Sequence, residues 1–247
     1  STQSRSSAAS DVYKRQIGMS SMLILFFKAA ILVPITMLPI INPFGNAPVF
    51  ASLLGNVSRD VEKKLARQVA LNCFFLLLGA MFIGSHVLMF FGISIPIVRI
   101  SGGLLVAFTA WKLLNDNGQD AIRTQVATNP MEAWSDEEFK VRSFYPISFP
   151  LTVGPGAIAA SITLGASTPA RLLDQVISLG SAAVGAAMTA FVIWLCYNSA
   201  NKMVKMLGRL GTMVTLRLSA FILLCIGIEI FWTGVIGLLV EAGVAVQ

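Results

Sequence analysis

Charged residues are scarce in this chain. Of its 247 residues only 12% are Asp, Glu, Lys or Arg, while 55% are hydrophobic and the mean hydropathy is +0.76. A soluble domain carries about a quarter charged residues, so this composition argues against one. The charges lie between runs of about eighteen or more mostly apolar residues, the length that crosses a bilayer. We therefore predict an all-α integral membrane protein.

Residues that support enzyme chemistry are also few. The three cysteines, Cys73, Cys196 and Cys225, lie in separate apolar runs without metal or disulfide spacing. No His-Glu-x-x-His, Gly-x-Ser-x-Gly or Walker motif occurs. We expect no enzyme activity, no catalytic residue, no metal and no cofactor. The net charge of +6 comes from short basic connections between apolar runs, so we also expect no nucleic-acid partner.

Two proline-rich stretches interrupt the apolar runs. Residues 39–48 read Pro-Ile-Ile-Asn-Pro-Phe-Gly-Asn-Ala-Pro, and residues 146–155 read Pro-Ile-Ser-Phe-Pro-Leu-Thr-Val-Gly-Pro, with the same proline spacing. Proline removes a backbone donor and clashes with the preceding helical turn. The first apolar region, residues 21–54, would be about 51 Å long as one helix, against a hydrocarbon core of roughly 30 Å. We predict broken helices at both stretches.

Six apolar regions divide the chain into two halves. We expect a non-native or disordered tail at 1–18, because it is polar and Ser-rich, and a first three-helix repeat at 19–114. A cytoplasmic loop at 115–143 and a second three-helix repeat at 144–247 follow. The proline stretches are offset by 107 residues, and Arg99-Ile-Ser101 is echoed by Arg217-Leu-Ser219. Because each half has three membrane segments, an odd number, the second half would enter the membrane in the opposite orientation to the first. The sequence therefore predicts two inverted repeats.

Lys and Arg are distributed unevenly among the connections. The first, third and fifth connections hold twelve of them, and the second and fourth hold only Arg99 and Arg171. The positive-inside rule then places the odd connections in the cytoplasm and both termini on the external side. The chain is thus expected to be a multi-pass membrane protein.

Three stretches carry a family resemblance: Asn42-Pro-Phe-Gly-Asn-Ala-Pro48, residues 91–107 and residues 149–159. They closely resemble the MarC family of bacterial and archaeal membrane proteins, over about residues 22–240. The resemblance implies a six-helix protein of the bacterial inner membrane with two inverted three-helix halves. For some members it implies transport of small neutral amino acids such as alanine and glycine. Glu229 departs from the pattern, because relatives are expected to have an uncharged polar residue there.

The proline stretches are also the candidate substrate site. The half-helix that follows each break begins with free N–H groups that favour a carboxylate, and unwound carbonyls and Asn amides would accept from an ammonium group. We expect a site that is polar and neutral overall, without a cationic side chain. The alternative is that both stretches are only structural kinks. The candidate substrate-binding residues are Asn42, Pro43, Gly45, Asn46, Pro48, Thr152, Gly154, Pro155 and Gly156.

Glu229 is a charged residue near the middle of the sixth apolar region. It is the candidate for coupling to a proton or Na⁺, and facing a wet cavity without function is the alternative. We interpret Lys28, Arg99, Arg217 and His86 as interfacial residues and Asn72 as an interhelical hydrogen-bond donor or acceptor.

The function that these features favour is secondary transport of small neutral amino acids by alternating access, with export inferred from the family resemblance. A channel or facilitator for small solutes and a non-transporting membrane scaffold remain alternatives. The expected partners are the amino acid substrate, the lipid bilayer and a coupling proton or Na⁺. A homo-oligomer is left open.

Overall fold

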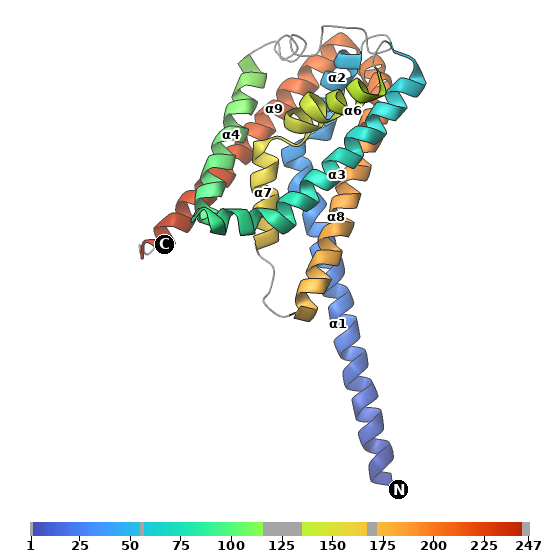
Figure 1. Ribbon diagram of the computed structural model, residues 1–247, viewed down its shortest axis with the longest axis vertical. Helices are drawn as coiled ribbons and strands as arrows, with labels where there is room; N and C mark the ends of the chain where they lie inside the picture. Colours follow the sequence, from blue (N-terminus) through green and yellow to red (C-terminus); the bar gives the residue numbers. More distant parts are fainter. Residues whose placement is uncertain (1, 55–56, 116–134, 167–171, 244–247) are drawn as a thin grey trace.

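The computed structural model describes residues 2–54, 57–115, 135–166 and 172–243, and all regular structure in these ranges is helical. The helices are α1 (Thr2–Ile41), α2 (Pro43–Leu54), α3 (Arg59–Phe90), α4 (Ile95–Asn115), α6 (Asp136–Arg142), the π-type helix η2 (Ser143–Thr152), α7 (Pro155–Ala166), α8 (Leu172–Asn198) and α9 (Ala200–Glu241). Residues 2–18, the expected tail, belong to α1, which extends beyond the bundle (Figure 1). Their side chains lie outside the described part of the chain.

Five of the described helices are long and apolar enough to cross a membrane, and the number rises to six if residues 136–152 and 155–166 form one bent span. The first span is Met22–Ile41, so the predicted first region is divided between α1 and α2. The last span is Leu210–Glu241. The prediction of an all-helical membrane protein is thereby confirmed.

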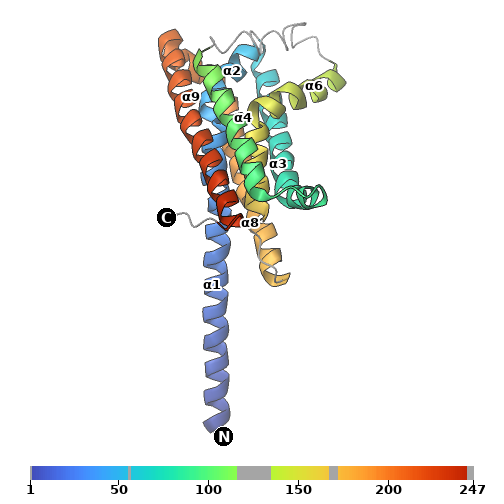
Figure 2. The ribbon, with the colours of Figure 1, turned by 90° about the vertical axis from the view of Figure 1, so that its left-hand side faces the viewer.

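The long spans form two groups with a layer between them: α4 with α9, and α8 with both α1 and α3. Helix α4 lies along α9 in both views, and α3 packs on α8 (Figures 1 and 2). The short helices α2 and α7 lie between these groups: α2 contacts α8 and α9, and α7 contacts α3 and α4. This middle layer contains both proline stretches.

Glycines allow the close approach of α4 and α9. A Cβ on Gly103 would meet the backbone of Phe231 and the Gly227 oxygen at 2.7 Å, and a Cβ on Gly227 would meet the Gly103 oxygen at 3.0 Å. Small residues at helix contacts let backbones approach in lipid, where dispersion contacts must replace the hydrophobic effect. Gly208 has another role: its φ of 64° and ψ of −177° interrupt the helical backbone of α9 near its start, a conformation that glycine adopts at little cost.

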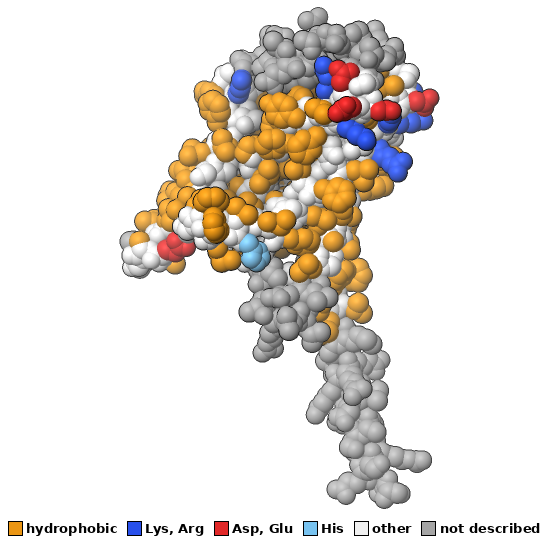
Figure 3. Space-filling view, viewed as in Figure 1, with side chains coloured by type: hydrophobic (Ala, Val, Ile, Leu, Met, Phe, Trp, Pro, Cys, Tyr) orange, Lys and Arg blue, Asp and Glu red, His pale blue; other side chains and the backbone are white. Residues whose placement is uncertain are grey.

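The surface matches a bilayer environment. Large apolar side chains such as Phe75, Phe108 and Phe191 are exposed on the spans. On the face shown in Figure 3, Lys and Arg side chains gather at the end of the molecule that holds α6 and the start of α3. An apolar belt with a charged end is typical of a protein that crosses a membrane.

Candidate functional site

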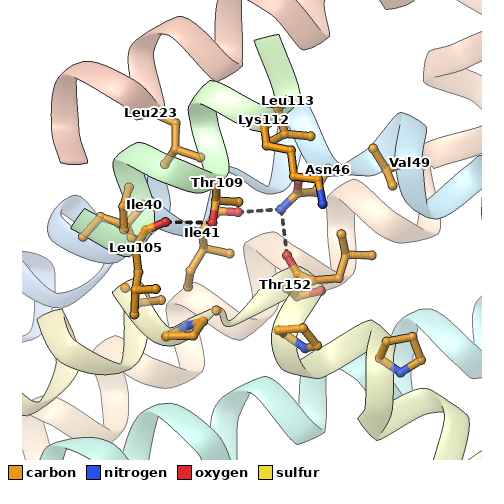
Figure 4. Close-up of a pocket in the computed structure, with 18 residues that line it drawn as sticks. Ile40, Ile41, Asn46, Val49, Leu105, Thr109, Lys112, Leu113, Thr152 and Leu223 are labelled. Atoms are coloured by element: carbon orange, nitrogen blue, oxygen red, sulfur yellow. Dashed lines mark hydrogen bonds between the residues drawn. The ribbon is translucent and has the colours of Figure 1, made fainter. Parts of the chain in front are cut away.

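The two proline stretches meet at a cavity of about 320 Å³. Its wall is formed by the end of α1, the first turns of α2, the C-terminal half of α4, η2, the start of α7 and Leu223 of α9 (Figure 4). Ligand pockets span about 300–1,000 Å³, so this one suits a small solute. Most of the wall is apolar, with a few polar groups from Asn46, Thr109, Lys112 and Thr152.

The first stretch changes direction at Asn42. Pro43 cannot donate to the carbonyl of Pro39, its partner in a continuous helix, and α1 ends at Ile41. Asn42 has a φ of 49°, and its Oδ1 accepts a 3.1 Å hydrogen bond from the Gly45 N–H. Asn42 is therefore the N-cap of α2, a position that Asn favours.

The second stretch bends more sharply. The segment Asp136–Thr152 meets Pro155–Ala166 at 74°. Tyr145 and Phe149 have extended backbone angles inside η2, as expected for residues that precede proline. α7 then begins at Pro155, beside the cavity.

Asn46 joins the two stretches. Its Nδ2 donates to the Ile41 oxygen at 2.9 Å and to the Leu151 oxygen at 3.3 Å (Figure 4). Each carbonyl has lost its usual helical partner, because the Gly45 N–H is used by Asn42 and Pro155 has no N–H. One side-chain amide from the first half thus satisfies a freed carbonyl in each half.

Thr152 is held from the other side. Its hydroxyl lies 2.7 Å from the Ile147 oxygen, to which it donates, and 2.9 Å from the Tyr197 hydroxyl of α8. The Tyr197 ring is fully buried and stacks on Phe50 of α2 with ring centroids 4.3 Å apart. The second stretch is therefore fixed to α8 and, through that ring, to α2.

The structure brings part of the predicted site together. Five of the nine candidate substrate-binding residues line the cavity: Asn46, Thr152, Gly154, Pro155 and Gly156. The other four, Asn42, Pro43, Gly45 and Pro48, are not among the lining residues, and Gly45 packs instead against Ser219 of α9. The first stretch thus contributes a side chain to the cavity, whereas the second contributes its backbone and a helix start.

Two polar lining residues, Thr109 and Lys112, are outside the predicted set. Thr109 and Lys112 lie on the same face of α4 as Leu105, all three at the cavity. The i, i+4, i+7 spacing of these residues was a signal in the sequence, but Lys112 was counted only as an orienting charge. Because Lys112 is there, the wall carries a cationic side chain, which differs from the expected neutral site.

Glu229 lies apart from the cavity. It is exposed on α9 and is not a lining residue, so its role in coupling stays a prediction. Lys28, Arg217 and His86 are exposed and Arg99 is half-buried. Asn72 of α3 donates to the Ser148 hydroxyl of η2 at 3.1 Å, which is the interhelical hydrogen bond expected of it.

The fold and the cavity define a helical membrane protein, and comparison with known proteins gives its family. The model of the MarC family of integral membrane proteins matches residues 27–239, so the chain belongs to that family. It is 31% identical over 212 residues to a Salmonella typhimurium protein named UPF0056 inner membrane protein MarC, and 30% identical over 212 residues to the protein of that name from Escherichia coli O1:K1. Each match covers 85% of this chain and 95% of the relative. No solved structure matches.

Proposed function

We propose that this chain is a secondary transporter that carries small neutral amino acids across the bacterial inner membrane by alternating access. The observation that carries the proposal is the cavity of about 320 Å³ between the two proline stretches. Transporter sites commonly form where interrupted helices from two halves of a protein meet. The names of the Salmonella and Escherichia relatives support the inner-membrane location.

The two halves are proposed to be inverted repeats. In this arrangement α1, α2, α3 and α4 correspond to η2, α7, α8 and α9. The packing supports it, since three main contacts have counterparts: α4 with α7 and α9 with α2, α3 with η2 and α8 with α1, α3 with α7 and α8 with α2. Gly45 packs against Ser219, next to Arg217, and Gly156 packs against Gly102, close to Arg99. The first proline stretch thus meets the Arg-x-Ser segment of the opposite half, and the glycine after the second stretch meets the glycine after the other Arg-x-Ser segment.

Alternating access requires that these halves move relative to each other around the substrate. The end of the molecule rich in Lys and Arg is proposed to face the cytoplasm, with both termini outside. A reporter fused to the C-terminus that is active only outside the cytoplasm tests this orientation, and activity of a cytoplasm-specific reporter there would contradict it. Export is the proposed direction.

Flux through liposomes tests the function itself. Liposomes that contain the purified protein are expected to take up labelled alanine, glycine or serine and to exchange it for unlabelled substrate inside. Counterflow of this kind identifies a carrier, whereas flux without counterflow would indicate a channel. Absence of both flux and binding for all three amino acids would refute the proposal.

A matched pair of variants tests whether the transported solute passes through this cavity. Thr109 and Ser101 are both exposed on α4, and their hydroxyls donate to carbonyls one turn earlier at 2.7 and 2.9 Å. Only Thr109 lines the cavity. Thr109→Trp is expected to abolish flux by filling the cavity, while Ser101→Trp keeps it. Equal flux in both variants would show that solute does not pass this cavity.

A further inference from the structure

The charge of the cavity points to the part of the solute that it recognises. We propose that Lys112 binds the carboxylate of the transported solute, and that the site selects solutes by this carboxylate and does not require their ammonium group. This inference rests on the proposed transport function and assigns it a specificity residue. A solute that keeps the carboxylate but lacks the amine would then occupy the same site.

Lys112 supplies the only formal charge in the cavity wall. The described lining residues include one lysine, no arginine or histidine and no acidic residue. The acidic residues of the described spans lie elsewhere: none of Asp60, Glu62, Glu229, Glu241 and the three acidic residues of α6 lines the cavity. A cavity with one positive charge and an apolar wall favours an anion over a cation, because the low dielectric strengthens the attraction of opposite charges.

The position of Lys112 is consistent with this role. Its side chain extends from α4 to beside Asn46, over the polar part of the cavity (Figure 4). Some basic residues at this end have acidic partners: Arg59 pairs with Glu62 at 2.8 Å and Lys64 with Asp136 at 3.2 Å. Among the residues that the structure describes, Lys112 makes no such ion pair. Its ammonium group is therefore available to a solute.

The remaining polar groups also suit a carboxylate better than an ammonium group. The start of α7, residues 155–157, lines the cavity, and the first turn of a helix presents N–H groups without helical partners and partial positive charge. The carbonyls of Ile41 and Leu151, which could have accepted from an ammonium group, already accept from Asn46. Lys112 and the start of α7 therefore offer donors where few free acceptors remain.

A lysine in the last turn of a helix has two simpler roles. It interacts favourably with the C-terminal end of the helix dipole, and on the cytoplasmic side it helps to orient the protein. If Lys112 had only these two roles, replacing it would change the affinity for every solute by the same factor. If Lys112 binds the carboxylate, replacing it would weaken only the solutes that have a carboxylate. Affinities for several solutes, measured on the folded protein, therefore distinguish the two cases.

The experiment measures the displacement of labelled L-alanine from purified full-length protein by L-alanine, L-lactate and L-alaninamide. Lactate keeps the carboxylate and lacks the amine, and alaninamide has the reverse pattern. The wild type is expected to bind alanine and lactate with similar affinity and alaninamide at least tenfold more weakly. Lys112→Gln is expected to lower the affinity for alanine and lactate by roughly ten- to hundredfold, the range for a hydrogen bond to a charged group. The affinity for alaninamide is expected to stay unchanged.

Two further variants complete the design. Lys112→Arg keeps the charge and is expected to retain the preference for carboxylates. Lys205→Gln removes the same charge from an exposed position of α9 outside the cavity and should bind as the wild type does. Liposome counterflow of alanine by each variant confirms that it is folded and inserted, since the weakened Lys112→Gln protein should still exchange at raised alanine concentration.

The outcomes distinguish this inference from the proposed function. If the wild type transports alanine but Lys112→Gln binds all three compounds as before, or loses all three equally, the role of Lys112 is refuted and transport stands. Stronger binding of alaninamide than of lactate to the wild type would refute it as well. If the wild type neither binds nor transports alanine or lactate, both proposals are wrong.

Discussion

Replacing Asn46 by alanine is the sharpest test of how the two proline stretches are held together. The substitution removes the Nδ2 donor that bonds the Ile41 oxygen at 2.9 Å and the Leu151 oxygen at 3.3 Å. The α-helical backbone donor to Leu151 is missing, because the residue four positions later is Pro155. Both carbonyls would lose their protein donor at once.

The expected loss of stability follows from these two bonds. Hydrogen bonds between side chains and other groups in membrane helices contribute about 0.6 kcal/mol on average and up to about 1.7 kcal/mol. Two of them give about 1–3 kcal/mol, with the shorter bond to Ile41 contributing more. Ile41 is buried and Leu151 is half-buried, so carbonyls left without a donor would move the loss toward the upper end of this range.

Equilibrium unfolding in detergent micelles, followed by tryptophan fluorescence, measures this loss. Asn201→Ala is the matched control, since Asn201 is half-buried on α9 and none of the described hydrogen bonds uses its side chain. The control is expected to lie within about 0.5 kcal/mol of the wild type. Equal stability of the two variants would show that Asn46 does not hold the stretches together.

Two other substitutions test the packing. Gly103→Ala places a methyl group against the backbone of Phe231 and should destabilise the protein by about 1–3 kcal/mol. Gly79→Ala has no atom within 4 Å of the added methyl group and should stabilise the helix by about 0.5–1 kcal/mol. If both substitutions changed the free energy of unfolding in micelles in the same direction, the close contact of α4 and α9 would be contradicted. Tyr197→Phe keeps the ring stacked on Phe50 and loses the 2.9 Å contact with the Thr152 hydroxyl. The free energy of unfolding should fall by about 0.5–1.5 kcal/mol. An unchanged free energy of unfolding would show that this contact does not stabilise the protein.

Much of the fold was predictable because hydropathy and proline act locally. Runs of apolar residues predict spans whatever their neighbours are, and a proline disrupts its own helix regardless of tertiary context. The positive φ of Asn42 and the bend before Pro155 fall inside the stretches named from sequence, whereas the inverted repeats stay a proposal. The short helix α6 in the expected loop was not predicted, although Ser135 and Glu138 form a capping box at its start.

The site was less predictable, since a side chain's direction depends on what packs around it. Pro43 and Gly45 belong to the same stretch as Asn46, yet α2 turns them away from the cavity and Gly45 towards α9. Lys112 was overlooked for a related reason. Its place near the end of an apolar run indicates a boundary charge, and only the packing of α4 beside η2 and α7 puts it at the cavity.

The hydrogen bonds of Asn46 also bear on the proposed transport cycle. Its bond to Ile41 lies within one half, because both residues belong to the first proline stretch. Its bond to Leu151 joins the two halves and is the longer of the two, at 3.3 Å. Relative movement of the halves would therefore break the second bond while the first stays intact. Opening it would free the Leu151 carbonyl at the cavity wall, so the cavity would gain an acceptor in one state of the cycle and lose it in the other. Affinity for a solute's ammonium group would then differ between the two states, whereas the carboxylate contact proposed for Lys112 would not depend on this bond.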